Sequence, residues 1–158
     1  MQILAMENPD HWKKTIEESK IVITDFWAGW CRPCLMLGET MKKMAHADEE
    51  AKKFTDITVA KIDTEADAFR DLSMELQVTS IPTMMIFIKG KLVAFGGQGG
   101  QTQDRIMGAL PQQQLEGLFS VLIEEADKPE ADHAHDHEHH DHVHDHDDQE
   151  QLEASEST

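Results

Sequence analysis

The sequence has only two cysteines among 158 residues, and no apolar run in it is long enough to cross a membrane. A transmembrane helix needs roughly 18 or more consecutive apolar residues. The first residues also carry no basic leader ahead of an apolar stretch. We therefore expect a soluble, cytoplasmic protein without a membrane partner.

Positive charge is absent from the end of the chain. Residues 129–158 hold eleven Asp or Glu and no Lys or Arg, so the net charge of −17 falls to −6 (20 acids, 14 bases) for residues 1–128. So acidic a protein does not attract a phosphate backbone, and nucleic-acid binding is not expected. The final segment has too few apolar side chains to offset the entropy of ordering it. We predict a folded domain over 1–127 and a disordered, acidic, His-rich tail over 128–158.

Apolar patterning predicts strands that alternate with helices. Predicted strands are 2–5, 21–28, 57–63 and a hairpin over 83–95, and predicted helices are 8–19, 33–54, 68–76 and 111–126. This order implies parallel strands with helices on both faces, and the hairpin adds antiparallel pairing. The glycine-rich stretch 96–108 is expected to be a mobile loop. The fold class is α/β with a mixed sheet.

Both cysteines lie at the predicted junction of a strand and a helix, in the sequence CRPC. This spacing places Cys31 and Cys34 on one helical turn, within the Cα separation of about 4.4–6.8 Å that a disulfide allows. The helix amino end favours a thiolate, which makes Cys31 the expected nucleophile. A staple over so short a loop stabilises little. Half of a zinc site remains an alternative, and would need ligands such as His11, His46 or the tail.

A resemblance to a known family is carried by four blocks, DFWAGWCRPC, VAKID, SIPT and FIKGKLVAF. In this order they resemble the corresponding blocks of the thioredoxin family, from about Ile3 to Ala126. The resemblance implies a central mixed five-stranded sheet flanked by four helices. It also implies a monomeric thiol–disulfide oxidoreductase that reduces disulfide-containing client proteins. Such a protein needs no cofactor for its redox chemistry and takes electrons from a donor similar to thioredoxin reductase.

The same resemblance assigns roles to residues. Cys31 attacks a client disulfide and Cys34 resolves the mixed disulfide. Asp25 and Lys61 match the carboxyl and lysine that assist proton transfer at the second cysteine. Asp25 also stands out unaided, because an unpaired carboxylate inside an apolar strand is costly and burial should raise its pKa; the alternative is a strand-end carboxylate that faces water. The implied client-binding residues are Trp30, Arg32, Pro33, Ile81, Pro82 (with a cis peptide bond) and Gly108.

Three positions depart from the family pattern. Arg32 replaces the usual glycine between the cysteines, and a cation there should favour the thiolate and make the protein more oxidising, by roughly a few tens of millivolts at most. Leu35 stands where the family often has lysine, and Glu39 stands where it has a helix-kinking proline. These two changes put the choice of clients in question more than the chemistry.

The tail holds eight of the ten histidines of the chain. Neutral imidazole is a good ligand for Zn, Ni and Cu, and metal affinity should fall toward pH 6 as imidazole becomes protonated. An alternative is a charged, solubilising tail with incidental histidines. A second function is therefore a thioredoxin-fold binding or chaperone protein whose tail binds or delivers a metal. The candidate ligands are His133, His135, His137, His139, His140, His142, His144 and His146.

Overall fold

Strands and helices alternate along the chain in the computed structural model, which describes residues 1–96 and 101–129. The strands are β1 (Gln2–Ala5), β2 (Ile21–Trp27), β3 (Ile57–Asp63), β4 (Thr83–Ile88), β5 (Lys91–Leu92), β6 (Phe95–Gly96), β7 (Thr102–Gln103) and β8 (Ile106–Met107). The helices are α1 (Pro9–Glu18), α2 (Arg32–Ala51), α3 (Asp67–Glu75) and α4 (Gln112–Asp127). None of the helices in these ranges is long and apolar enough to cross a membrane.

The main sheet is mixed, as predicted. Its strand order is β1-β3-β2-β4-β5, and β8 also pairs with β4. β1, β3 and β2 are parallel, whereas β4 runs antiparallel to β2, β5 and β8. The predicted α/β class with four helices is confirmed, and a sixth short strand is added to the five that were expected.

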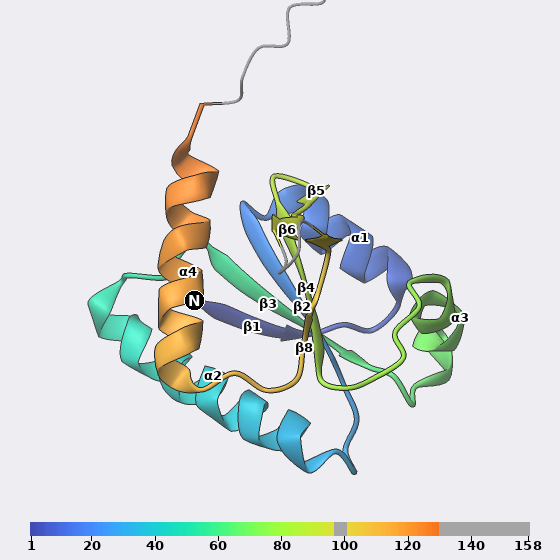
Figure 1. Ribbon diagram of the computed structural model, residues 1–158. Coiled ribbons are helices and arrows are strands. Elements are labelled where there is room, and N and C mark those ends of the chain that lie inside the picture. The colour runs from blue at the N-terminus through green and yellow to red at the C-terminus, as the bar shows by residue number, and fades with distance from the viewer. Residues whose placement is uncertain (97–100, 130–158) are drawn as a thin grey trace, which may run out of the picture. The chain divides into compact units, whose positions relative to one another are not determined.

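Helices cover both faces of the sheet, with α2 and α4 on one side and α1 and α3 on the other (Figure 1). Successive side chains of a strand point to opposite faces. Ile21 and Ile23 of β2 therefore pack in the core under α2 and α4, while Val22 and Phe26 pack under α1 and α3. The same alternation places Asp25, the next odd-numbered residue of β2, on the face covered by α2.

Local signals set the helix ends. The Asn8 side chain caps α1 by accepting a hydrogen bond from the His11 amide at 2.8 Å, and Pro9 follows at the first helical position. The helix α2 ends three residues earlier than predicted, because Lys52 adopts a left-handed conformation with φ of 54°. The Asp48 carboxylate holds this turn by accepting the Phe54 amide at 2.8 Å.

The predicted hairpin over 83–95 and the predicted loop over 96–108 need correction. The strand that follows the turn, β5, has only two residues, and β6 pairs with β7 in a separate two-stranded sheet. The strand β8 then returns to the main sheet, where Met107 pairs with Thr83. Thus β5 pairs with the carboxyl end of β4 and β8 pairs with its amino end. The glycine-rich part of the sequence comes between these two strands. Residues 97–100 and the predicted tail from Glu130 onward lie outside the described residues.

Candidate active site

The two cysteines form a disulfide at the amino end of α2. Their Cα atoms are 5.2 Å apart, within the predicted range. Cys31 is the N-cap of the helix, and its sulfur accepts a hydrogen bond from the Cys34 amide at 3.3 Å. Cys34 is fully buried, whereas 4% of Cys31 is exposed. The sulfur nearer to solvent is thus the one that the helix terminus favours as an anion.

A zinc site that uses both cysteines gains no support from the other residues that the structure describes. No group of three or more His, Cys, Asp or Glu side chains within 1–96 and 101–129 could hold a metal ion. His46 lies on α2 with 85% of its side chain exposed, and it faces Glu49. His11 lies on α1, where its ring accepts a hydrogen bond from the Glu7 amide. The two sulfurs are bonded to each other, as a redox couple requires.

A buried ion pair lies under α2. Asp25 is completely buried, and its Oδ2 lies 2.7 Å from Lys61 Nζ on the adjacent strand β3. The Lys61 ammonium also lies 4.8 Å from the centre of the Trp27 ring. Burial raises the pKa of Asp25, and the charge and hydrogen bond of Lys61 oppose that rise. The alternative of a water-facing carboxylate is therefore wrong, and the predicted rise in the pKa is confirmed in direction.

One oxygen of this carboxyl group is free to hold a proton. Oδ1 of Asp25 is buried and has no hydrogen-bond partner among the described residues. Cys34 lies on the buried side of α2, together with Leu37 and Met41, and Asp25 lies on the sheet face that α2 covers. The carboxyl group and the second cysteine therefore occupy the same interior between helix and sheet.

A third segment reaches the disulfide from the start of β4. The peptide bond between Ile81 and Pro82 is cis, as the family resemblance implied. The Ile81 carbonyl oxygen lies 3.8 Å from the Cys31 sulfur. The Pro82 carbonyl accepts the amide of Gly108 at 2.8 Å, and Gly108 has a φ of 91° that favours glycine. The fold thus brings together residues from three distant parts of the chain.

Exposed apolar side chains lie next to the disulfide. Trp30 is 71% exposed and Met74 is 66% exposed, and both line a hollow of about 420 Å³ that extends to Ile81. Met36, just after the cysteines, and Met107, just before Gly108, are also exposed. These exposed methionines were not among the residues predicted from the sequence. The signal for Met74 was available, because it lies outside the apolar stripe of Phe69, Leu72 and Leu76.

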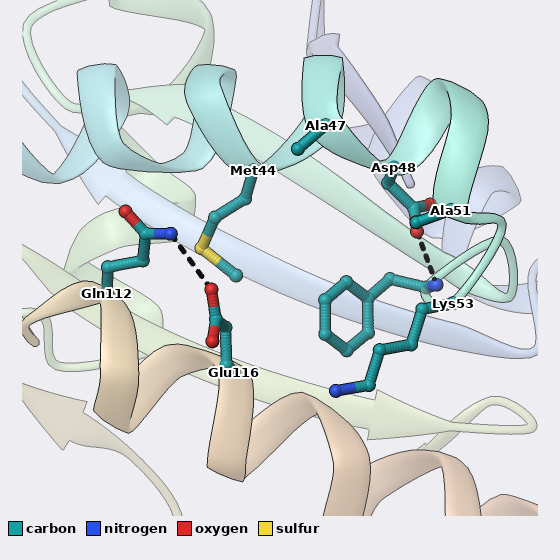
Figure 2. Close-up of a pocket in the computed structure, with 8 residues that line it drawn as sticks. Met44, Ala47, Asp48, Ala51, Lys53, Gln112 and Glu116 are labelled. Carbon is teal, nitrogen blue, oxygen red and sulfur yellow. Dashed lines mark hydrogen bonds between the residues drawn. The ribbon is translucent and has the colours of Figure 1, made fainter.

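A second pocket is remote from this chemistry. Figure 2 shows it between the carboxyl end of α2 and the start of α4, with Met44, Asp48 and Glu116 among its lining residues. Met44 follows Cys34 by ten residues in the same helix, which corresponds to about 15 Å along its axis. The pocket therefore contributes no side chain to the disulfide region.

Comparison with known proteins agrees with this geometry. Residues 3–114 match the family model described as Thioredoxin. The chain belongs to the thioredoxin family. It is 44% identical over 72 residues to a thioredoxin of Mycolicibacterium smegmatis, which covers 46% of this chain and 60% of that protein. It is 36% identical over 94 residues to a bifunctional thioredoxin reductase/thioredoxin of Mycobacterium leprae, covering 60% of this chain and 17% of that protein.

A solved structure shares the fold. A mutant thioredoxin from Halobacterium salinarum superposes with a TM-score of 0.57 at 25% identity, over 77% of this chain and 90% of that one. The match to the two curated relatives above spans less than two thirds of the length of either. The family and the fold are therefore shown, and the redox pair is the feature that this chain shares with thiol–disulfide oxidoreductases.

The structure gathers most of the predicted site residues in one region. Arg32 and Pro33 are exposed at the start of α2, next to Trp30. Ile81, Pro82 and Gly108 meet on the side of the Cys31 sulfur, and Asp25 with Lys61 lies in the interior. Their individual roles stay predictions. The eight candidate metal ligands of the tail lie outside the described residues.

Proposed function

We propose that this protein reduces disulfide bonds of client proteins by dithiol–disulfide exchange. The observation that supports this function most strongly is a cysteine pair that can bond across one helical turn, beside the cis peptide bond at Pro82. The exposed apolar side chains around it suit the docking of an unfolded or extended segment. In the described residues the amide of Ile81 makes no hydrogen bond, so it can pair with such a segment as one strand adds to another.

The reaction begins from the reduced pair. The Cys31 thiolate attacks one sulfur of the client disulfide, a mixed disulfide forms, and the other client sulfur leaves as a thiolate that takes up a proton. Cys34 then loses its proton and attacks the Cys31 sulfur. This second step forms the Cys31–Cys34 disulfide and releases the client with both cysteines reduced. Two electrons have moved from the protein to the client.

We propose that the Asp25 carboxylate accepts the proton that the Cys34 thiol loses. The carboxyl group is buried, its Oδ1 has no partner in the described part of the chain, and its pKa is raised by burial. A general base is most effective when its pKa lies near the working pH. The charge and hydrogen bond of Lys61 oppose the effect of burial and so limit the rise in the pKa of Asp25.

The cycle needs an electron donor. A relative of this chain carries a thioredoxin reductase in the same polypeptide, and we propose a donor of that class here. A cytoplasmic location, where thiols are kept reduced, and a monomeric state belong to the same proposal. We further assign client contacts to Trp30, Arg32 and the segment from Ile81 to Pro82.

An insulin turbidity assay tests the reductase function. The wild-type protein, Cys31→Ser and a chain truncated after Lys128 are compared with dithiothreitol as reductant. We expect the Cys31 variant to fall to the background rate and the truncated protein to keep its rate, because residues Met1–Lys128 form a compact unit that contains the pair. A truncated protein that is inactive, or a Cys31 variant that keeps its activity, would contradict the proposal.

We propose a second function for the tail, which is to bind a divalent metal such as Zn, Ni or Cu. Its support is compositional, namely eight histidines alternating with carboxylates between His133 and His146. Imidazole ligands must be neutral to bind metal. A storage or delivery role would leave the exchange chemistry of the folded domain intact.

Calorimetric titration with zinc tests this second function. At pH 7.5 we expect the full chain to bind zinc and the chain truncated after Lys128 to lose that binding, with weaker binding by the full chain at pH 6. A full-length variant with all eight tail histidines changed to glutamine is the matched control, because it keeps every carboxylate. Zinc binding that survives in this variant would show that imidazole is not the ligand.

A further inference from the structure

A glycine, Gly38, lies inside α2 beneath the active site. Gly38 lies seven residues into the helix, where glycine is less favourable than almost any other residue. Its backbone gives no reason for this choice, because the described glycines with positive φ are Gly90 and Gly108. The reason must therefore be space rather than conformation.

The space beside Gly38 is occupied by the Lys61 ammonium group. A Cβ atom built on Gly38 would lie 3.4 Å from Lys61 Nζ, and that nitrogen is its nearest contact. The same nitrogen lies 2.7 Å from Asp25 Oδ2. Lys61 Nζ also lies over the Trp27 ring, 4.8 Å from its centre. A methyl group at position 38 would just fit, whereas a longer side chain would compete with the ammonium for this volume.

Few other charged groups act on this pair. Asp25 is opposite Lys61 on β3 and opposite Met84 on β4, and Lys61 is the only described residue whose charge shifts its pKa. On α2, Cys34 lies one turn before Gly38 and so shares its face. Cys34 and the Lys61 ammonium therefore lie on the same side of α2, and Lys61 is the described cation whose charge acts on the Asp25 carboxyl group.

We infer that Gly38 is a positioning residue, which leaves open the space in which the Lys61 ammonium contacts Asp25 beneath the Cys31–Cys34 pair. The inference rests on the proposed exchange reaction only in its consequence for rate, since the contact itself is a property of the fold. A larger residue at this position would displace the ammonium and leave Asp25 buried without its counter-charge.

The test compares Gly38→Leu with Gly38→Ala, Lys61→Met and Gly117→Leu in the full-length protein. Gly117 lies within α4, and a Cβ atom there would meet nothing within 4 Å, so its leucine variant changes helix preference alone. The carboxyl carbon resonance of Asp25 is titrated by NMR in the oxidised protein, in which the thiols do not ionise. The pH profile of insulin reduction is then recorded for each variant.

Loss of a neighbouring ammonium raises the pKa of a carboxyl group. We expect Gly38→Leu to shift the Asp25 titration to higher pH by about one unit, in the same direction as Lys61→Met. The Gly38→Ala shift should be small, and Gly117→Leu should titrate as the wild type does. The rate profile of Gly38→Leu should move by the same amount as the NMR titration.

An Asp25 titration in Gly38→Leu that matches the wild type, while Lys61→Met shifts, would overturn the inference. Folding of each variant is checked in the same NMR spectra, and if Gly38→Leu is unfolded, Gly38→Val takes its place. A failure of insulin reduction in the wild-type protein would instead refute the proposed function and leave the titration result unaffected.

Discussion

Cys34→Ser is expected to turn the protein from a catalyst of disulfide reduction into a trap for its clients. Cys31 can still attack a client disulfide, but no second thiol remains to displace the client. Well-oriented groups reach effective molarities of about 10⁵–10⁸ M, so even if Cys34 falls far short of that limit, an external thiol at about 1 mM should release the client at least about 10³-fold more slowly. Turnover should therefore fall to background while a covalent adduct accumulates.

The adduct is measured by non-reducing electrophoresis and intact mass after incubation of the reduced variant with insulin. It should disappear when excess dithiothreitol is added. The structural basis is the difference in access between the sulfurs, since Cys34 is fully buried and only Cys31 reaches the surface. Cys31→Ser is the matched control and should form no adduct. A stable adduct through Cys34 in that control would reverse the assignment of nucleophile and resolving thiol.

Asp25→Asn is expected to make the protein more stable at neutral pH and slower as a catalyst. The wild-type carboxylate is completely buried and has one cation to offset its burial. Because burial outweighs the opposing effect of Lys61 and raises the pKa of Asp25, the fold disfavours the ionised carboxyl group, and a neutral amide of the same shape should raise the free energy of unfolding at neutral pH. The variant cannot accept the proton of Cys34, so insulin reduction at pH 7 should fall by about 10²-fold.

The stability gain has a definite dependence on pH. Because burial raises the pKa of Asp25 above its ordinary value of 3.8, the unfolded chain loses this proton at lower pH than the folded protein. The Asp25 carboxyl group therefore contributes fully to the stability of the wild type below its ordinary pKa of 3.8. This contribution to the free energy of unfolding is lost as the pH rises through the higher pKa of the folded state. The variant should gain stability relative to the wild type over the same range.

Urea unfolding of both proteins between pH 4 and pH 8 measures this difference. Asp71→Asn is the control, because Asp71 is exposed on α3, and it should show no such trend. Equal free energies of unfolding for Asp25→Asn and the wild type at every pH would refute the assignment of a raised pKa. A gain in stability without a loss of rate would support the burial of a charged Asp25 but contradict its role in proton transfer.

The elements that could be read from the sequence are those determined by local patterns. Asn8 followed by Pro9 marks the start of α1 because side-chain capping and a fixed φ act over a few residues. The apolar run of β2 indicates a strand covered on both faces for the same local reason. The CRPC spacing likewise predicts a disulfide, because the geometry of one helical turn is independent of the rest of the chain.

The elements that were misread depend on partners far away in the chain. The pattern predicts that the second strand of the hairpin runs from Lys91 to Phe95. In the structure β5 ends at Leu92, and Phe95 belongs to β6, which pairs with β7. β8 lies in a stretch that the sequence predicts to be a loop. A strand can pair with the edge of β4 through its backbone N–H and C=O groups alone, so the pairing needs no pattern of apolar side chains. The apolar residues within 96–108 show no alternation that would predict this strand.

Three features can be predicted from the residues alone: the redox pair, the order of the long strands and helices, and the acidic, His-rich composition of the tail. Three others become visible only in the folded chain: Asp25 is buried against Lys61, Gly38 leaves room for this contact, and the Gly108 amide donates a hydrogen bond to the Pro82 carbonyl. The physical reason is range. Propensity, capping and helical spacing act within a few residues, whereas burial and ion pairing depend on which strands become neighbours in the sheet.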